Sequence, residues 1–269
     1  MDKKKTVLVV VAHGDDMEFL AGGTVARFVD EKGYDVFEYI LTDNSKGSYS
    51  LSAEELRERS AREAEEAGRV LGLKEVRQEG YPDGLLNEAP PNVVREKIMA
   101  MIREVRADVV LGWDPFAPCE EHPDHRVGGM ALLEAASFSS IPLYHPEHAH
   151  PPYLVTETYW IAKHPWNAEL FVDVSGTIDK KIEALLKHET QMELTVDGLR
   201  LEAEALGVDA APFQDSGPEG CRRIIDMGIR SFCAAVGEKA GMPYAEQFRY
   251  EKLGMLDRIL GNDLVKPDF

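Results

Sequence analysis

The sequence lacks the features that mark nucleic-acid-binding, membrane-spanning and disulfide-stabilised proteins. Lysines and arginines number 30 against 48 aspartates and glutamates, for a formal charge of −18. This shortage of cations disfavours nucleic acid and anionic membranes as partners. Three cysteines without paired spacing predict free thiols rather than disulfides. No apolar run approaches the roughly 20 residues of a membrane span, so we expect a cytoplasmic protein.

Two nucleotide-binding signatures are also missing. The Gly22-Gly23 pair comes too late after the first apolar run, residues 6–12, to form a phosphate-binding turn, and no G-x-G-x-x-G accompanies it. The chain has no P-loop either. Both absences disfavour an enzyme that uses nucleotides.

What the sequence does contain is an alternation of strand and helix patterns. Continuous apolar runs at residues 6–12 and 109–113, with a further strand at 35–42, are typical of strands that helices cover on both faces. The intervening helical patterns predict an α/β fold with a doubly wound, mostly parallel sheet and helices on both faces. We treat residues 1–269 as a single domain, with a core of about residues 1–140 on which the C-terminal strands and helices of about 141–269 pack.

The helices and one loop are predicted from several different local signals. Gly22-Gly23 and Thr24 are expected to open the first helix, and a capping box at Ser52 predicts a helix that ends at Leu71. The amphipathic stretch Ile178–Met192 predicts one continuous helix. Residues 142–153 hold three histidines and four prolines, and we interpret them as a rigid irregular loop with exposed histidines rather than a metal site.

Two short motifs carry most of the chemical information. His13-Gly14-Asp15-Asp16 follows the first predicted strand, and His122-Pro123-Asp124-His125 follows the strand at 109–113. In a doubly wound sheet these two strands are neighbours, and ligands bind outside the carboxyl ends of the strands where the order reverses. Both motifs should therefore face one crevice.

The residue types in these motifs suit a catalytic metal. Zinc takes three ligands from histidine and carboxylate side chains and keeps a fourth position for water, and His13, Asp16 and His125 form such a set. Asp15 would then be free to act as general base, and His122 to stabilise an oxyanion or protonate a leaving amine. This inventory suits hydrolysis of an amide or ester. Zinc is the expected ion, although other divalent transition metals also fit the set.

Each motif also has a structural interpretation. Asp15 and Asp16 would cap the helix after the first strand, and Asp124 would cap the helix after the second motif. Either motif alone can occur by chance. Their joint occurrence after two neighbouring strands favours the metal site.

At these residues the chain resembles the LmbE-like, or PIG-L, family of zinc-dependent N-acetylglucosaminyl deacetylases. Ala12-His13-Gly14-Asp15-Asp16 corresponds to the family's first motif, with Gly14 in place of proline, and the second motif is intact. The resemblance implies a Rossmann-like fold, an acetyl group removed from an N-acetylglucosamine-type sugar or its conjugate, and the metal and catalytic residues named above. It extends to further stretches, among them Tyr81-Pro82-Asp83-Gly84.

The resemblance also suggests where substrate binds. Ser60 replaces an arginine that contacts substrate in relatives, with Arg59 beside it. The residues expected near the substrate are Asp83, Asp43, Lys46 and Arg59, with His188 and Asp124 as further candidates.

The expected partner is a small amino-sugar molecule, with no nucleic acid and no membrane; a homo-oligomer stays open. Two alternatives to the deacetylase also stay open: an inactive metal-dependent carbohydrate-binding protein, and a zinc amidase that acts on a non-sugar N-acyl substrate. Intact Asp15 and His122 argue against the binding protein, which needs neither.

Overall fold

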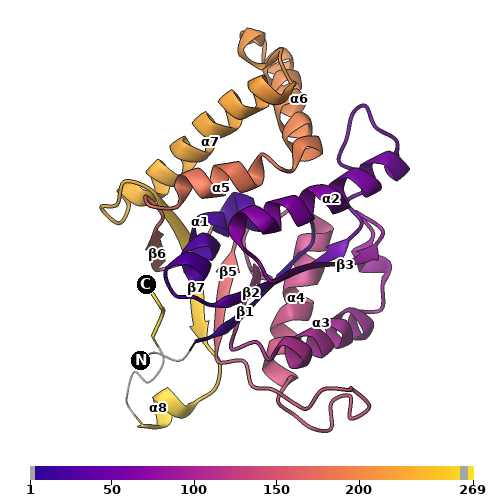
Figure 1. The fold of residues 1–269 in the computed structure, drawn as a ribbon, viewed down its shortest axis with the longest axis vertical. Coiled ribbons are helices and arrows are strands. Elements are labelled where there is room, and N and C mark those ends of the chain that lie inside the picture. Colours follow the sequence, from indigo (N-terminus) through magenta and orange to yellow (C-terminus); the bar gives the residue numbers. More distant parts are fainter. Residues whose placement is uncertain (1–3, 261–265) are drawn as a thin grey trace.

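The fold is built on one seven-stranded sheet with the order β3-β2-β1-β4-β5-β7-β6 (Figure 1). The computed structural model describes residues 4–260 and 266–269, so residues 1–3 and 261–265 of the expected domain lie outside it. The strands are β1 (Thr6–Val11), β2 (Asp35–Thr42), β3 (Glu75–Tyr81), β4 (Val109–Trp113), β5 (Glu157–Ile161), β6 (Leu170–Asp173) and β7 (Ala245–Lys252).

Helices connect the strands and extend beyond them. Two short 3₁₀ turns, η1 (Leu86–Glu88) and η2 (Ala211–Phe213), accompany them. The α-helices are α1 (Asp16–Asp30), α2 (Ala53–Leu71), α3 (Pro91–Val105), α4 (Pro123–Phe138), α5 (Ile178–Leu185), α6 (Glu189–Leu206), α7 (Pro218–Glu238) and α8 (Leu256–Leu260).

Strand pairing confirms the mostly parallel α/β sheet. Strands β3, β2, β1, β4 and β5 pair in parallel, whereas β7 pairs antiparallel with both β5 and β6. Strand β1 lies directly beside β4, with Val7 opposite Val109. From β1 the chain builds outward to β2 and β3, and from β4 it builds in the other direction. The carboxyl ends of β1 and β4 therefore meet at the point where the strand order reverses.

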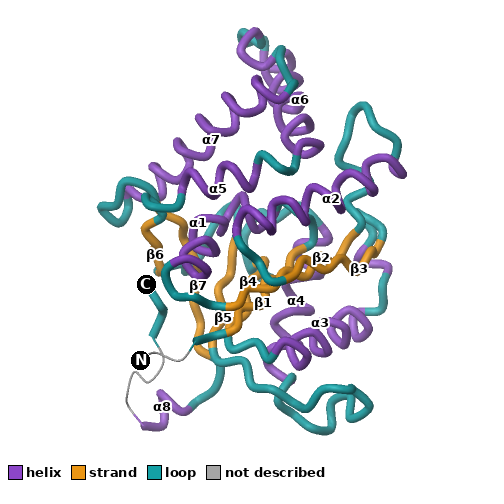
Figure 2. Tube along the Cα trace, in the orientation of Figure 1, coloured by secondary structure: helices purple, strands orange, loops and turns teal. Residues whose placement is uncertain are grey.

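Both faces of the sheet are covered. Alternate residues of a strand point to opposite faces, and Val7, Val9 and Val11 of β1 pack in one buried core with α1 and α2. Leu8 and Val10 pack in a second core with α3 and α4. Figure 2 shows the strands as one sheet between these helix layers.

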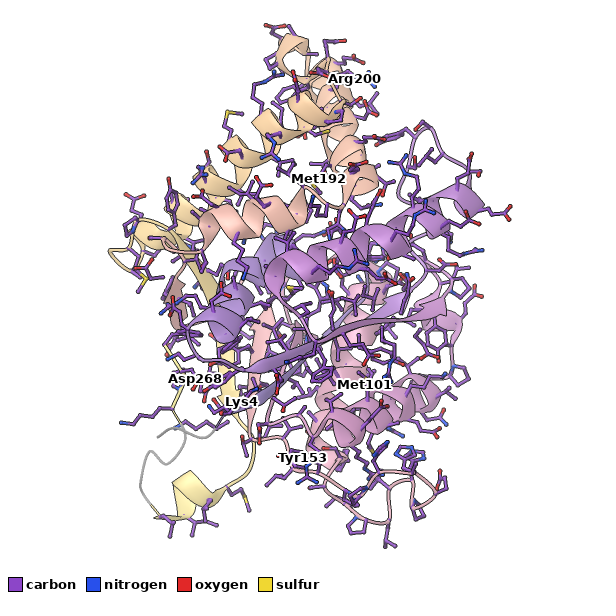
Figure 3. The ribbon with its side chains drawn as sticks, in the orientation of Figure 1. Lys4, Met101, Tyr153, Met192, Arg200 and Asp268 are labelled. Carbon is purple, nitrogen blue, oxygen red and sulfur yellow. The ribbon has the colours of Figure 1, made fainter. Side chains whose placement is uncertain are left out.

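A third core lies outside the sheet. It joins α5, α6 and α7 through buried residues that include Ile182, Met192 and Ile225. In Figure 3, Met192 lies near the start of α6 and Arg200 lies further along the part of the helix that projects away from the sheet. No helix within residues 4–260 and 266–269 combines the length and apolarity that crossing a bilayer requires.

The first helix begins earlier than the glycine pair predicts. Helix α1 starts at Asp16, and Gly22 and Gly23 lie in its interior. A Cβ at Gly23 would lie 2.7 Å from the Val174 side chain, and one at Gly22 would lie 3.1 Å from Lys181. The glycines therefore permit close packing of α1 against these residues and do not mark a helix start.

The stretch Ile178–Met192 is two helices rather than one. Helix α5 ends at Leu185 and α6 begins at Glu189. Glu63 of α2 accepts hydrogen bonds from the backbone N–H of Thr190, at 3.2 Å, and from its hydroxyl, at 2.6 Å. A carboxylate from a distant helix thus satisfies one of the backbone N–H groups in the first turn of α6, which the local sequence pattern does not reveal.

Candidate metal and catalytic site

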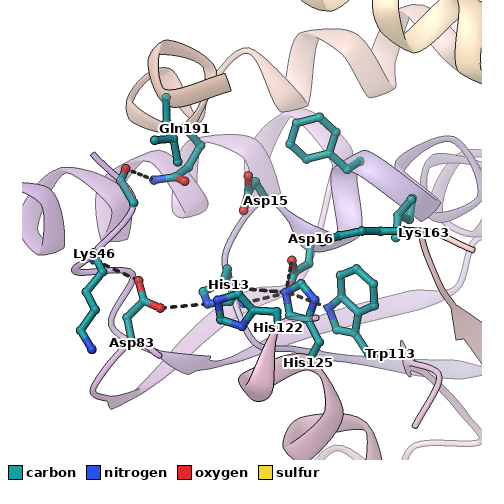
Figure 4. Close-up of a pocket in the computed structure, with 14 residues that line it drawn as sticks. His13, Asp15, Asp16, Lys46, Asp83, Trp113, His122, His125, Lys163 and Gln191 are labelled. Carbon is teal, nitrogen blue, oxygen red and sulfur yellow. Dashed lines mark hydrogen bonds and ion pairs between the residues drawn. The ribbon is translucent and has the colours of Figure 1, made fainter. Parts of the chain in front are cut away.

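A cavity of about 500 Å³ lies at the carboxyl ends of β1 and β4. Both sequence motifs contribute to its wall, as expected from the adjacency of the two strands. Figure 4 shows His13, His122 and His125 grouped between Asp83 on one side and Trp113 on the other. The lining residues are His13, Asp15, Asp16, Phe19, Leu20, Lys46, Gly47, Asp83, Trp113, His122, His125, Lys163, Gln191 and Leu194.

Asp16 is held firmly at the start of α1. Its Oδ2 accepts hydrogen bonds from the backbone N–H groups of Ala12 (3.1 Å) and His13 (2.9 Å) and from Trp113 Nε1 (2.8 Å). Its Oδ1 lies 3.3 Å from His125 Nε2. Although burial opposes the charge, His125 and His13 hold the pKa of Asp16 well below its usual range. One oxygen is thus occupied by donors, and the other faces the histidine.

The two candidate ligand histidines present one nitrogen each to the same point. His13 Nδ1 lies 3.2 Å from His125 Nε2. The opposite nitrogen of each ring has a carboxylate partner: His13 Nε2 lies 3.2 Å from Asp83 Oδ1, and His125 Nδ1 lies 2.9 Å from Glu120 Oε1. Such outer partners fix the tautomer and the orientation of metal-binding histidines.

The residues present fit a divalent metal. Ligand atoms about 2.0–2.1 Å from a tetrahedral zinc ion lie roughly 3.3–3.4 Å apart, close to the 3.2 and 3.3 Å that separate His125 Nε2 from His13 Nδ1 and Asp16 Oδ1. His13 Nδ1 lies 3.7 Å from Asp16 Oδ2. Two imidazole nitrogens and one carboxylate oxygen form a donor set that zinc prefers.

His122 is close enough to join the metal set, because its ring, with those of His13 and His125, offers nitrogens within 4.8 Å of one another. Its Nδ1, however, accepts a hydrogen bond of 3.3 Å from the backbone N–H of Asp124 at the start of α4. In a neutral ring this bond leaves the proton on Nε2. Burial and the nearby His13 and His125 lower the pKa of His122. The arrangement therefore favours a neutral hydrogen-bond donor over a metal ligand.

Asp15 occupies the N-cap position of α1, but its side chain makes no capping hydrogen bond. It lines the cavity beside Asp16. Burial and the Asp16 charge raise the pKa of Asp15 to about 6. A carboxylate with a raised pKa and no capping role can accept a proton near neutral pH. The purely structural interpretation of Asp15 therefore does not account for its placement.

Asp124 does not cap its own helix, because the N-cap residue of α4 is His122. Its carboxylate accepts hydrogen bonds from the backbone N–H groups of Gly84 (2.7 Å) and Leu86 (3.0 Å). It also lies 3.7 Å from His13 Nε2. Asp124 thus holds the loop after β3, and with it Asp83, against the candidate metal site.

The predicted substrate residues separate into two groups. Asp83 and Lys46 line the cavity, and Asp83 Oδ2 accepts a hydrogen bond from the Lys46 backbone N–H at 3.0 Å. Asp43 is not among the lining residues; its carboxylate accepts hydrogen bonds from the Asp83 backbone N–H and from Arg57. Arg59 is not among them either.

Arg59 and His188 lie on or beside the helices near the site, but neither is among the residues that line the cavity. The Arg59 guanidinium lies 3.6 Å from carboxylate oxygens of Glu63 and Glu189. His188 is 1% exposed, and its Nε2 lies 3.6 Å from Glu18 Oε1. A Cβ at Gly14 would lie 3.5 Å from the His188 ring, so this histidine packs behind the first motif rather than lining the cavity.

Sequence reasoning does not predict the contacts by which two residues hold the site, although Glu120 and its neighbour stand out as acidic residues before the second motif. Glu120 Oε1 accepts from both His125 Nδ1 and the His122 backbone N–H (3.1 Å). Trp113 stacks on His125, with ring centroids 3.8 Å apart, and donates to Asp16. The sequence offers a signal for both residues: Glu120 precedes the second motif by two residues, and Trp113 is the last residue of β4.

The protein has a mostly parallel α/β sheet, and a cluster of histidines and carboxylates lies at the carboxyl ends of the central strands. These two features define the class: an α/β enzyme with a candidate metal site of the hydrolase type. Comparisons with known proteins specify this class. The family description PIG-L: GlcNAc-PI de-N-acetylase matches residues 8–136. The chain is thus similar to the PIG-L/LmbE-like family of deacetylases, as the motifs predict.

Individual relatives cover most of the chain. A diacetylchitobiose deacetylase of Thermococcus kodakarensis is 29% identical over 252 residues, which are 91% of this chain and 83% of the relative. A probable N-acetyl-alpha-D-glucosaminyl L-malate deacetylase 2 of Bacillus anthracis is 26% identical over 216 residues, 76% of this chain and 89% of the relative. The solved N,N'-diacetylchitobiose deacetylase of Pyrococcus horikoshii superposes with a TM-score of 0.74 at 27% identity, covering 92% of this chain and 84% of that one.

Proposed function

We propose that this protein is a zinc-dependent hydrolase that removes the acetyl group from an N-acetylated amino sugar of the N-acetylglucosamine type, or from a conjugate of such a sugar. The observation that carries the proposal is that His125 Nε2 lies within 3.3 Å of both His13 Nδ1 and Asp16 Oδ1, while the opposite atom of each side chain has its own partner. The names of the relatives, a diacetylchitobiose deacetylase and a probable N-acetyl-alpha-D-glucosaminyl L-malate deacetylase, support the choice of substrate.

His13, Asp16 and His125 would hold the metal. When bound, zinc supplies Lewis-acid chemistry, making water a nucleophile near neutral pH and polarising a carbonyl oxygen. Asp15 accepts the proton that the attacking water loses, at a carboxylate whose raised pKa suits transfer near neutral pH. The Nε2–H of His122 donates a hydrogen bond to the oxyanion that forms from the amide carbonyl.

The reaction is a simple amide hydrolysis. The water oxygen bonds to the acetyl carbon, the carbon–nitrogen bond breaks, and the amine leaves with a proton. Asp15, protonated in the first step, is the group placed to return that proton to the leaving nitrogen. The products are acetate and the free amino sugar.

Polar side chains give the sugar a place in the cavity. Asp83, Lys46 and Gln191 line the wall on the side away from Trp113, and hydroxyl groups of a sugar need such partners when they leave water. Asp43 acts through Asp83, whose backbone N–H donates to it at 3.1 Å. We assign sugar binding to Asp83, Lys46 and Gln191, and a positioning role to Asp43.

Acetate release from a substrate panel tests the proposal. The protein would be stripped with a chelator, reloaded with zinc, and offered N-acetylglucosamine, diacetylchitobiose, N-acetylglucosaminyl conjugates and, as a non-sugar control, N-acetyl amino acids. We expect metal-dependent acetate release from at least one sugar compound. Cleavage of the non-sugar amides alone would favour an amidase, and sugar binding without acetate release would favour a carbohydrate-binding protein; either result contradicts the proposal.

A further inference from the structure

A second cavity, of about 430 Å³, lies between α1, α6 and α7. Several of its lining residues, among them Ile224, Ile225 and Ile229, belong to the third core, and Figure 1 shows how α1, α6 and α7 are arranged. Met227 and Phe232 are 55% and 41% exposed although they are large and apolar. Thr195 carries the one side-chain hydroxyl among its lining residues, and none of those residues is charged.

This apolar cavity adjoins the catalytic cavity. Phe19 and Leu20, in the second turn of α1, line both. Leu194 of α6 lines the catalytic cavity, and the next residue, Thr195, lines the apolar one. A chain attached to a molecule bound beside His13 and Asp16 would therefore meet apolar side chains of α1 in the direction of α7.

The two cavities differ in the chemistry they can receive. The catalytic cavity has charged and amide side chains for a sugar, including Asp83, Lys46 and Gln191. The apolar cavity has almost none, so a sugar hydroxyl or a charged group that entered it would lose its hydrogen bonds to water without replacement. A hydrocarbon chain, by contrast, gains free energy when it leaves water for such walls.

We infer that the substrate carries an alkyl chain, and that the cavity of α1, α6 and α7 binds this chain while the sugar amide lies at the catalytic site. The inference rests on the proposed function. The chain has two chemical sources: the acyl group of the amide, or an alkyl aglycone on the sugar. An acyl chain and an alkyl aglycone present the same hydrocarbon surface to the cavity, and the experiment below distinguishes the two sources.

Gly228 offers a way to close the cavity without disturbing the catalytic site. It lies inside α7 and lines the cavity, and a Cβ there would meet no atom within 4 Å. Gly228→Leu therefore adds an apolar side chain where space exists, and leucine favours the helix more than glycine does. Gly198→Leu is the matched control, because Gly198 is an equally open interior glycine of α6 that does not line the cavity.

The measurement is kcat/KM for amine release by the zinc-loaded enzyme from two series of compounds. One series is the methyl, butyl, hexyl and octyl glycosides of N-acetylglucosamine; the other is glucosamine with N-acetyl, N-butanoyl, N-hexanoyl and N-octanoyl groups. In one series we expect kcat/KM to rise by roughly fourfold for each methylene that is buried. Gly228→Leu should abolish this rise, Gly198→Leu should preserve it, and both should cleave the methyl glycoside of N-acetylglucosamine like the wild type.

Other results overturn the inference. Equal kcat/KM across both series would show that no chain is bound, and a rise that survives Gly228→Leu would place the chain elsewhere. A third result has three parts: the wild type self-associates, Gly228→Leu dissociates it whereas Gly198→Leu does not, and neither series shows a rise in kcat/KM. This result would mean that the apolar cavity is a contact between copies of this chain, and it would overturn the inference.

Failure of the proposed function is distinguishable from failure of this inference. If no compound is cleaved, calorimetric binding of the octyl glycoside of glucosamine and of octanoate still tests the cavity. Binding of either probe to the wild type and to Gly198→Leu, but at least tenfold weaker binding to Gly228→Leu, would support the inference. Undetectable binding of both probes would overturn it.

Discussion

Two regions of the described part of the chain, residues 4–260 and 266–269, gather histidines and carboxylates, and the two clusters are held in opposite ways. The first is the site at the ends of β1 and β4. The second joins Glu96 of α3 to His145, Glu147 and His148 of the loop after α4, with side-chain donors within 4.8 Å of one another. By composition alone, both are candidate metal sites.

The second cluster is organised around an arginine. Arg103 is 1% exposed and donates hydrogen bonds to the backbone carbonyls of Ser139, Ile141, Tyr144 and His145. Its Nη1 also lies 3.0 Å from His148 Nδ1. The loop carbonyls converge on one guanidinium, which fixes an irregular segment.

This arrangement works against metal binding. A guanidinium only donates hydrogen bonds, so His148 Nδ1 accepts and a neutral ring carries its proton on Nε2, the nitrogen that faces Glu96. Burial and the Arg103 charge also lower the pKa of His148. In the first cluster, carboxylates occupy the outer nitrogens of His13 and His125, and the inner nitrogens face each other beside Asp16. The partners of the histidines, rather than their number, distinguish a site from a structural contact.

The histidines of the second cluster are also less exposed than the sequence predicts. His145 and His148 are half-buried and stack with ring centroids 5.0 Å apart, whereas His150 is exposed. The absence of helix and strand between α4 and β5 agrees with the expected irregular loop.

The sharpest test of the comparison removes one histidine from the first cluster. We expect His125→Ala to lose stoichiometric zinc and measurable acetate release, because it deletes the nitrogen that lies 3.2 Å from His13 Nδ1 and 3.3 Å from Asp16 Oδ1. Elemental analysis of the purified protein measures the zinc. Zinc at the wild-type level would show that His125 is not a ligand.

The next largest effect separates metal binding from proton transfer. We expect Asp15→Ala to retain stoichiometric zinc while kcat falls by about 10²- to 10⁴-fold. The physical reason is that Asp15 lines the cavity but has no hydrogen bond to a candidate ligand side chain. Acetate release and zinc content would be measured on the same sample, and wild-type kcat would exclude Asp15 as the general base.

A smaller effect is expected at the outer partner of His125. Glu120→Ala should weaken zinc binding by about 10- to 100-fold in competition with a chelator, because His125 loses the carboxylate that orients it. Glu120→Gln retains an acceptor oxygen and should lose less. Glu121→Ala is the control, since Glu121 is exposed and pairs with Lys163 instead. Equal zinc affinity in all three variants would contradict the orienting role.

The smallest effect is expected in the second cluster. His148→Ala should leave zinc content and acetate release unchanged and lower the free energy of unfolding by about 1 kcal/mol, through loss of its contact with Arg103. Denaturant unfolding measures the stability change. A fall in bound zinc would mean that this cluster also holds metal.

The sequence predicts that the two motifs lie close together, and it does so for a physical reason. Strand runs and their order determine which strand ends meet, so the adjacency of β1 and β4 brings His13, Asp16 and His125 together. Contacts between distant elements are harder to predict. The capping of α6 by Glu63 and the packing of Gly23 against Val174 depend on tertiary structure, and no local pattern encodes them.

The orientation of side chains around the site is likewise invisible in the sequence. The order of Glu120 and Glu121 along the chain does not reveal that the first holds His125 and the second pairs with Lys163. The same limit applies to Arg59, which the resemblance places near substrate and which lies beside Glu63 and Glu189 in the structure.

Asp16 is also a mechanical link between two strands. One oxygen joins the backbone after β1, at Ala12 and His13, to the indole of Trp113 at the end of β4. Replacing Asp16 would therefore loosen this edge of the sheet at the same time as it removed a ligand, and the two losses would be confounded in any assay. The same link joins the ends of β1 and β4 through protein contacts alone, so this edge of the candidate metal site is held by the fold itself.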